Sequence, residues 1–105
     1  MSAGSDRSRA LFEQGRLDEA VALGRQLLRD AEASEQGLGN AAATLGRLLA
    51  RKLEHHDAAM LLARAVRELP RDDHNQRGAA FLGLAWSLER LGRFREADVA
   101  WTQAQ

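Results

Sequence analysis

Apolar residues recur every three or four positions along most of this chain, which is the spacing that places them on one face of an α-helix. Gly15 and Gly92 are expected to turn the chain, and Pro70 to end a helix. Either Asp72 or Asp73 can cap the helix that follows. The pattern predicts six helices, at about residues 6–14, 17–33, 40–52, 57–69, 76–91 and 94–104. They form three hairpins, at about residues 5–36, 38–70 and 73–105, within one domain of residues 1–105.

Small residues recur through the three hairpins at a nearly constant period. Ala20, Ala58 and Ala97 stand 38 and 39 residues apart. Leu62 follows Ala58 by four positions, and Trp101 follows Ala97 by four, so a small side chain on one helix can face a large one on its partner. A repeat of this length indicates stacked units, each too small to bury its own apolar face. Such stacks usually bind other molecules rather than transform them.

Composition narrows the fold class to all-α. Alanine, leucine, arginine and glutamate dominate, β-branched residues are few, and Pro70 is the single proline. The formal net charge of +0 does not favour binding to nucleic acid. The sequence has no cysteine and no apolar run of signal-peptide or transmembrane length, so we expect a cytoplasmic protein without a membrane partner. Fourteen arginines against one lysine indicate a bacterium with a GC-rich genome, or else a functional need for guanidinium groups.

The repeats share a motif. The third contains Phe81-x2-Leu84-Ala85-x2-Leu88, followed by Ala97 and Trp101. The second contains Ala42-x2-Leu45-Gly46-x2-Leu49, followed by Ala58, Leu62 and Pro70, and the first keeps Leu11, residues 15–20 and Leu27. These residues resemble the tetratricopeptide repeat, W-x2-L-G-x2-Y followed by A-x3-F and P, in a lengthened form similar to that of bacterial regulators and kinesin-light-chain-like proteins. Leu53 replaces the glycine that the middle hairpin turn would have in the family.

The resemblance implies a short right-handed superhelix of stacked hairpins, with a concave groove that binds a peptide or a partner protein. The family's groove positions fall on Ser5, Arg9, Phe12, Asn40, Ala43, Arg47, Arg51, Ala79, Leu82, Trp86, Glu89 and Arg90. The candidate peptide-binding residues among them are Arg9, Asn40, Arg47, Arg51, Trp86 and Arg90. Guanidinium groups pair with carboxylates and tryptophan anchors apolar groups, so an acidic peptide or a C-terminal carboxylate is the expected ligand. The alternative is that these arginines are solvated and paired with Glu13, Glu54 or Glu89.

The last hairpin carries a second candidate surface. Phe94, Val99 and Trp101 are expected to remain partly uncovered, because repeat arrays usually finish with a polar capping helix. Self-association through this surface would give a homodimer. The alternative is that the sixth helix already presents a polar outer face, made by Arg95, Glu96, Asp98, Thr102 and Gln103.

No catalytic set, phosphate-binding loop or spaced metal ligands are visible in the sequence. His55, His56 and His74 are interpreted as surface turn residues rather than metal ligands. We therefore expect a non-enzymatic protein–protein interaction module without a cofactor, metal or nucleic-acid partner. The alternatives are a structural or dimerising helical domain and a regulatory fragment of a larger, transcription-related protein.

Overall fold

The structure, a computed structural model, describes residues 15–105 and contains helices and no strand over that range. The helices are α2 (Leu17–Ser34), α3 (Leu38–Arg51), α4 (His55–Glu68), α5 (His74–Arg90) and α6 (Phe94–Ala104). Their bounds agree with the predicted helices to within two residues, and the all-α prediction is confirmed. The helix predicted at about residues 6–14 lies outside the described residues. Within residues 15–105, no helix has the length and apolar character needed to cross a bilayer.

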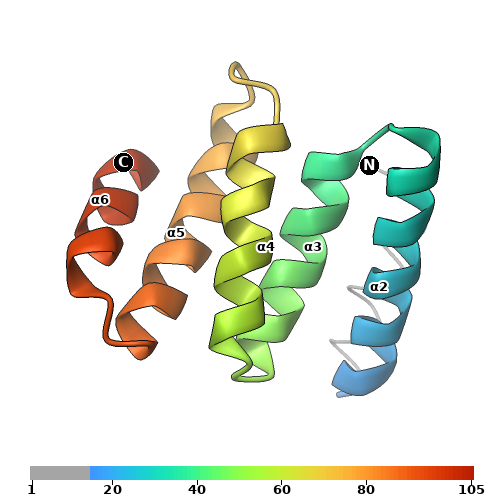
Figure 1. The fold of residues 1–105 in the computed structure, drawn as a ribbon, viewed down its shortest axis with the longest axis horizontal. Helices are drawn as coiled ribbons and strands as arrows, with labels where there is room; N and C mark the ends of the chain where they lie inside the picture. Colours follow the sequence, from blue (N-terminus) through green and yellow to red (C-terminus); the bar gives the residue numbers. More distant parts are fainter. Residues whose placement is uncertain (1–14) are drawn as a thin grey trace.

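Consecutive helices run antiparallel in an array that begins at α2 and ends at α6 (Figure 1). α3 pairs with α4, and α5 pairs with α6, across short turns, as the second and third predicted hairpins require. α4 also packs against α5, and α3 contacts α5 directly. Helix α4 therefore covers the line along which α3 and α5 meet (Figure 1).

Two clusters of buried side chains run through the array. One joins α2, α3 and the start of α4, and the other joins α3, α4, α5 and α6. Ala20 and Ala58 belong to the first cluster, Ala97 belongs to the second, and all three are buried. The recurring small residues thus lie where helices cross, and short side chains let the helix axes approach one another closely.

Leu62 of α4 lies where α4 crosses both α3 and α5 closely. Its side chain is fully buried at 0% exposure. A Cβ added to Gly46 of α3 would stand 2.8 Å from Leu62 Cγ, as the predicted pairing of small and large residues requires. A Cβ added to Gly83 of α5 would stand 3.1 Å from Leu62 Cδ1. The leucine therefore fits between two glycines on two different helices, and either glycine could gain a side chain only if Leu62 moved.

Three equivalent positions of the repeat have a positive backbone φ. Gly15, Leu53 and Gly92 have φ values of 76°, 67° and 78°. After α5, the N–H of Gly92 donates to the carbonyl of Glu89 and the N–H of Arg93 to that of Leu88, which is a Schellman motif. The same two bonds occur 39 residues earlier, where Leu53 donates to Ala50 and Glu54 to Leu49. Leu53 therefore adopts the left-handed conformation that glycine adopts in the other two turns.

The connection between α4 and α5 has the predicted stop at Pro70 and a predicted aspartate cap at the start of α5. Leu69, which precedes Pro70, is extended with φ −68° and ψ 144°, and α4 ends one residue earlier. Asp73, rather than Asp72, caps α5, because its Oδ1 accepts a hydrogen bond from the backbone N–H of Gln76 at 3.1 Å.

Leu53→Gly is expected to raise the free energy of unfolding by roughly 0.5–1 kcal/mol, because glycine adopts a positive φ without a Cβ clash. The leucine side chain is 68% exposed, so its removal costs little packing. Urea unfolding measures the change. Gly92→Leu is the matched control, since a Cβ there meets no atom within 4 Å and adds only backbone strain. It should lower the free energy of unfolding by roughly 1–2 kcal/mol, and an unchanged or lowered stability of Leu53→Gly would contradict the turn geometry.

Gly39→Ala is expected to destabilise the fold by about 1–3 kcal/mol, because the new Cβ would stand 2.7 Å from the backbone nitrogen of Leu69. Backbone cannot rotate away as a side chain can. Gly78→Ala, also inside a helix, meets only Ala104 O at 3.5 Å, which is an ordinary contact. That variant should gain roughly 0.5–1 kcal/mol from helix propensity. Thermal unfolding measures the midpoint temperature of each variant. Equal shifts of that temperature in the same direction would refute the close approach at Gly39.

Candidate functional site

Helices α3 and α5 run parallel to each other (Figure 1), and their C-terminal halves carry four of the six candidate peptide-binding residues, which are Arg47, Arg51, Trp86 and Arg90. Arg47 of α3 is half-buried and reaches α5, where its Cγ lies 3.9 Å from the position that a Cβ on Gly83 would take. Arg51 is exposed one turn further along α3, and Trp86 lies one turn beyond Gly83 on α5. Arg90 is exposed one turn after Trp86.

Trp86 contacts an apolar cluster, the imidazole of His55 and the guanidinium of Arg90. The indole is half-buried and packs against the cluster shared by α2, α3 and the start of α4. The imidazole of His55 meets it edge to face, with ring centroids 4.8 Å apart and an interplanar angle of 79°. Arg90 Cζ lies 5.5 Å from the indole centroid, within the range of a cation–π contact. Trp86 is therefore held in place on one side and reachable by solvent on the other.

The remaining predicted groove residues are distributed differently. Asn40 is exposed at the start of α3, about 16 Å along the helix from Arg51 at the usual rise per residue. Ala43 is fully buried in the core, so its placement in the groove is wrong, because α5 packs over it. Ala79 is half-buried and Leu82 is 50% exposed. Ser5, Arg9 and Phe12 lie outside the described residues.

The predicted self-association residues lie on α6. Phe94 and Val99 are each 64% exposed, and Trp101 is half-buried. The indole N–H of Trp101 donates a hydrogen bond to Glu89 Oε2 at 2.8 Å, which ties α6 to α5. Phe94 and Trp101 are seven residues apart and share a side of the helix, whereas Val99 falls between helical turns on another side. The three residues therefore do not form one continuous patch.

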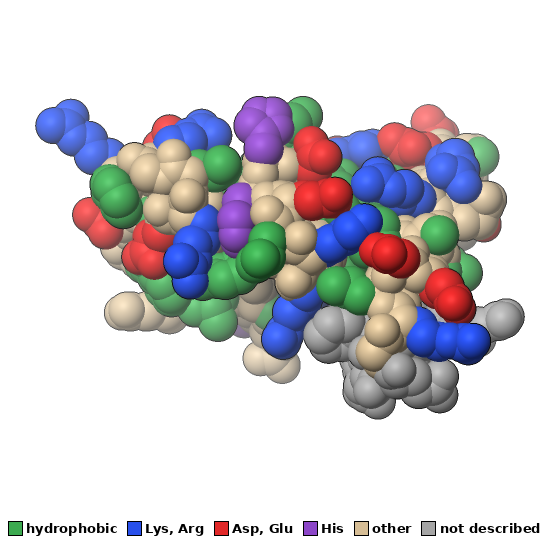
Figure 2. Space-filling view, turned by 90° about the horizontal axis from the view of Figure 1, so that it is seen from below, with side chains coloured by type: hydrophobic (Ala, Val, Ile, Leu, Met, Phe, Trp, Pro, Cys, Tyr) green, Lys and Arg blue, Asp and Glu red, His purple; other side chains and the backbone are tan. Residues whose placement is uncertain are grey.

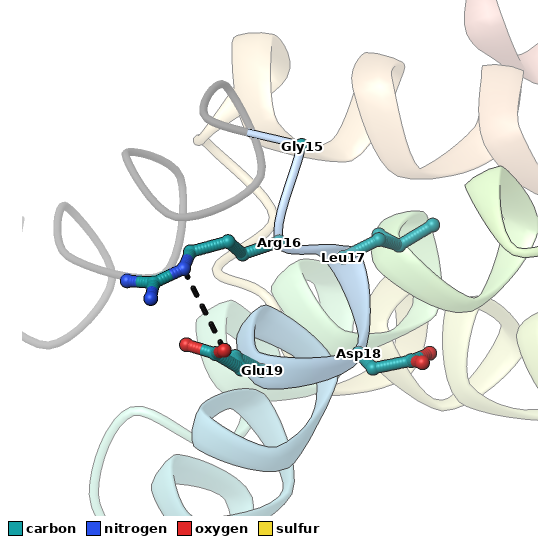
Figure 3. Close-up of a pocket in the computed structure, with 5 residues that line it drawn as sticks. All are labelled: Gly15, Arg16, Leu17, Asp18 and Glu19. Atoms are coloured by element: carbon teal, nitrogen blue, oxygen red, sulfur yellow. Dashed lines mark ion pairs between the residues drawn. The ribbon is translucent and has the colours of Figure 1, made fainter.

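A shallow hollow at the start of α2 is lined by five consecutive residues, Gly15, Arg16, Leu17, Asp18 and Glu19 (Figure 3). Arg16 Nε pairs with Glu19 Oε1 at 3.6 Å, and both side chains are exposed. Asp18 pairs outside the hollow with Lys52 Nζ at 3.0 Å, which joins α2 to the turn after α3. The hydrogen bond and charge of Asp18, with a smaller effect from Glu54, raise the pKa of Lys52 above 10.5. The charged side chains among the five described lining residues are therefore engaged in ion pairs.

The histidines do not form a metal centre within the part of the chain that the structure describes. His56 and His74 are exposed, as predicted, and His56 Nδ1 lies 3.7 Å from Asp57 Oδ1. His55 differs from its prediction as a surface residue, since it begins α4 and packs on Trp86. No three residues of the histidine, cysteine or acidic type lie close enough among residues 15–105 to hold a metal ion. Seen from the end where α3 and α5 finish, acidic and basic side chains are interspersed around the histidines (Figure 2).

Two residues of this surface are not among the predicted groove residues. Gly83 lets Leu62 and Arg47 approach α5, and His55 supports Trp86. The repeat register contains a hint for His55, which begins α4 as Phe94 begins α6. A single chain sequence has no comparable hint that a glycine within α5 marks a helix crossing.

Comparisons of the chain with protein-family models, with curated proteins and with solved structures find no match. The geometry of the described residues is therefore the basis for a functional proposal. That geometry offers arginines beside a half-buried tryptophan, which suits non-covalent binding of carboxylates and apolar groups.

Asp18→Asn is expected to bring the pKa of Lys52 back toward 10.5, because the carboxylate that favours the ammonium form is removed. Since the folded chain has the higher pKa, the Asp18–Lys52 pair stabilises the fold fully below pH 10.5 and loses that contribution as the pH rises through the raised pKa. NMR titration of the single lysine measures the shift without ambiguity of assignment. Glu19→Gln, at an exposed neighbour that does not contact Lys52, is the control and should leave the titration unchanged. The same pKa in wild type and Asp18→Asn would contradict the ion pair.

Proposed function

We propose that this protein is a non-enzymatic interaction module that binds an acidic peptide, or an acidic segment of a partner protein, on the face formed by α3 and α5. The observation that carries the proposal is the half-buried Trp86, which Arg90 contacts and which lies one turn from the point where Arg47 of α3 reaches α5. Tryptophan and arginine are the residue types most enriched among those that dominate binding energy.

The chemistry of this face favours a carboxylate ligand with an apolar neighbour. Each guanidinium has donors arranged to match a carboxylate in a two-point contact. Trp86 offers an apolar surface that is already ordered by His55 and Arg90, so binding costs little side-chain entropy there. An extended acidic peptide with one apolar side chain can use both features.

We further propose that the hairpins form a tetratricopeptide-like right-handed superhelix, with α3 and α5 on its concave side. Three features support this assignment: the shared φ at Gly15, Leu53 and Gly92, the direct contact between α3 and α5, and the cover that α4 provides over both helices. A concave side lined by successive first helices is where extended peptides bind in repeat proteins of this kind.

The proposal predicts that Arg47→Glu with Arg51→Glu weakens binding of an acidic peptide about tenfold or more, because two attractions become repulsions. The probe is an eight-residue peptide of Glu, Asp and Leu with a free C-terminal carboxylate. In a Trp101→Phe background, Trp86 is the single tryptophan, so its fluorescence reports binding at the proposed site. An amidated copy of the peptide separates recognition of the terminal carboxylate from that of the acidic side chains.

The control variant, Arg71→Glu with Arg95→Glu, changes the net charge equally at two exposed residues away from this face. It should keep the affinity within about twofold. Arg90→Glu is a second test at an exposed position, in case the double variant unfolds. Equal loss of affinity in the control and the Arg47/Arg51 variant, or saturation without a change in Trp86 fluorescence, would show that the peptide does not bind here.

A further inference from the structure

Helix α5 covers a stripe of α4 whose residues recur at helical spacing. The stripe consists of His55, Ala59, Leu62 and Val66. His55 at one end contacts the Trp86 ring, and Leu62 in the middle lies against Gly83. The covering helix thus presents a large ring to the start of α4 and a residue without a side chain to its middle.

The other two members of the stripe are also engaged. Arg77 Nη1 of α5 donates a hydrogen bond to the carbonyl of Val66 at 2.6 Å, near the C-terminal end of α4. Ala59 is buried at the same interface. Helix α5 therefore contacts this stripe at His55, at Leu62 and at the carbonyl of Val66, where the cation suits the partial negative charge of a helix C-terminus.

The equivalent stripe on α6 has no covering helix in the described structure. It lies 39 residues later and consists of Phe94, Asp98, Trp101 and Gln105. Phe94 is 64% exposed, Asp98 and Gln105 are exposed, and Trp101 is only half-buried. Helix α6 stands at the end of the array opposite α2 (Figure 1).

Helix α5 is likewise more exposed than α3 at equivalent positions of the repeat. Ala43 and Ala50 of α3 are buried, whereas their equivalents Leu82 and Glu89 on α5 are exposed. We call Leu82 and Glu89 with the α6 stripe the end face. By contrast, Met60 of α4 remains 61% exposed beside α5, so its equivalent Val99 does not belong to the end face.

Charge indicates what kind of helix fits the end face. Two buried alanines, Ala50 of α3 and Ala59 of α4, correspond 39 residues later to Glu89 and Asp98 of the end face. Glu89 accepts the indole N–H of Trp101, and Asp98 lies one turn before Trp101 on α6. A second copy joined about a two-fold axis would bring the carboxylates of both copies into one interface, which is unfavourable. A helix that brings cations to Glu89 and Asp98 meets no such repulsion.

We propose that the end face docks a basic amphipathic helix of a partner protein, laid across α6 as α5 is laid across α4. Trp101 is larger than Leu62, so the docked helix needs a small residue opposite the indole, as α5 has Gly83 opposite Leu62. Its cationic residues face Glu89 and Asp98, and an apolar side chain covers Phe94. This surface is separate from the α3–α5 face and does not depend on the function proposed for it.

The test uses two synthetic helices based on α5, residues 73–91. In the basic peptide, Asp73 is replaced by Asn and Glu89 by Arg. In the acidic peptide, Arg77 and Arg90 are each replaced by Glu. Calorimetry should show that the full chain binds the basic peptide at least about tenfold more tightly than the acidic one, and that added salt reduces the difference.

Phe94→Glu and Val99→Glu form a matched pair, because both side chains are 64% exposed on the same helix. Phe94→Glu should weaken binding of the basic peptide about tenfold, and Val99→Glu should leave it within about twofold. Asp98→Lys should reverse the preference between the two peptides. The Arg47→Glu, Arg51→Glu variant should bind the basic peptide as the wild type does, which separates this site from the α3–α5 face.

Three results would overturn the proposal. The first is equal affinity for the basic and acidic peptides, or no saturable binding of either. The second is an equal loss in Phe94→Glu and Val99→Glu. The third is sedimentation of the wild-type chain as a dimer that Phe94→Glu dissociates, which would identify a second copy as the occupant of the end face.

Discussion

The placement of Leu62 between Gly46 and Gly83 is the contact on which the arrangement of α3, α4 and α5 depends. One buried side chain on α4 meets two neighbouring helices at positions that have no side chain, so it fixes the spacing of three helices at once. Direct contact between α3 and α5 follows, because neither helix is held away by a Cβ at the crossing. The approach of Arg47 to α5 also depends on Gly83, because a side chain there would occupy the space beside Arg47.

The repeat makes it possible to compare one part of the chain with another. The stripe of α4 that α5 covers identifies which residues of α6 would be covered by a further helix, and exposure distinguishes the two. The two proposed surfaces also differ in charge. Arg47, Arg51 and Arg90 belong to the α3–α5 face, and Glu89 and Asp98 belong to the end face, in a chain whose formal net charge is +0. Partners of opposite charge are therefore expected at the two surfaces.

Helix positions, the stop at Pro70, a cap at Asp72 or Asp73 and the turn at Gly92 could be predicted because each depends on a few neighbouring residues. Burial across hairpins was harder to predict. Ala43 appears as a groove position when α3 is considered alone, but it is buried in the cluster that α3 shares with α4, α5 and α6. Val99 is apolar and exposed but lies away from the stripe that contains Phe94. The conformation of Leu53 follows from the Schellman hydrogen bonds of its turn, which no property of leucine itself indicates.

The most direct test of this account is the NMR measurement of short interproton distances from the Leu62 methyl groups. The structure predicts cross-peaks from these methyls to the α-protons of both Gly46 and Gly83, on helices that are far apart in sequence. Cross-peaks to only one of the two glycines, or to neither, would contradict the three-helix contact and with it the geometry of both proposed surfaces.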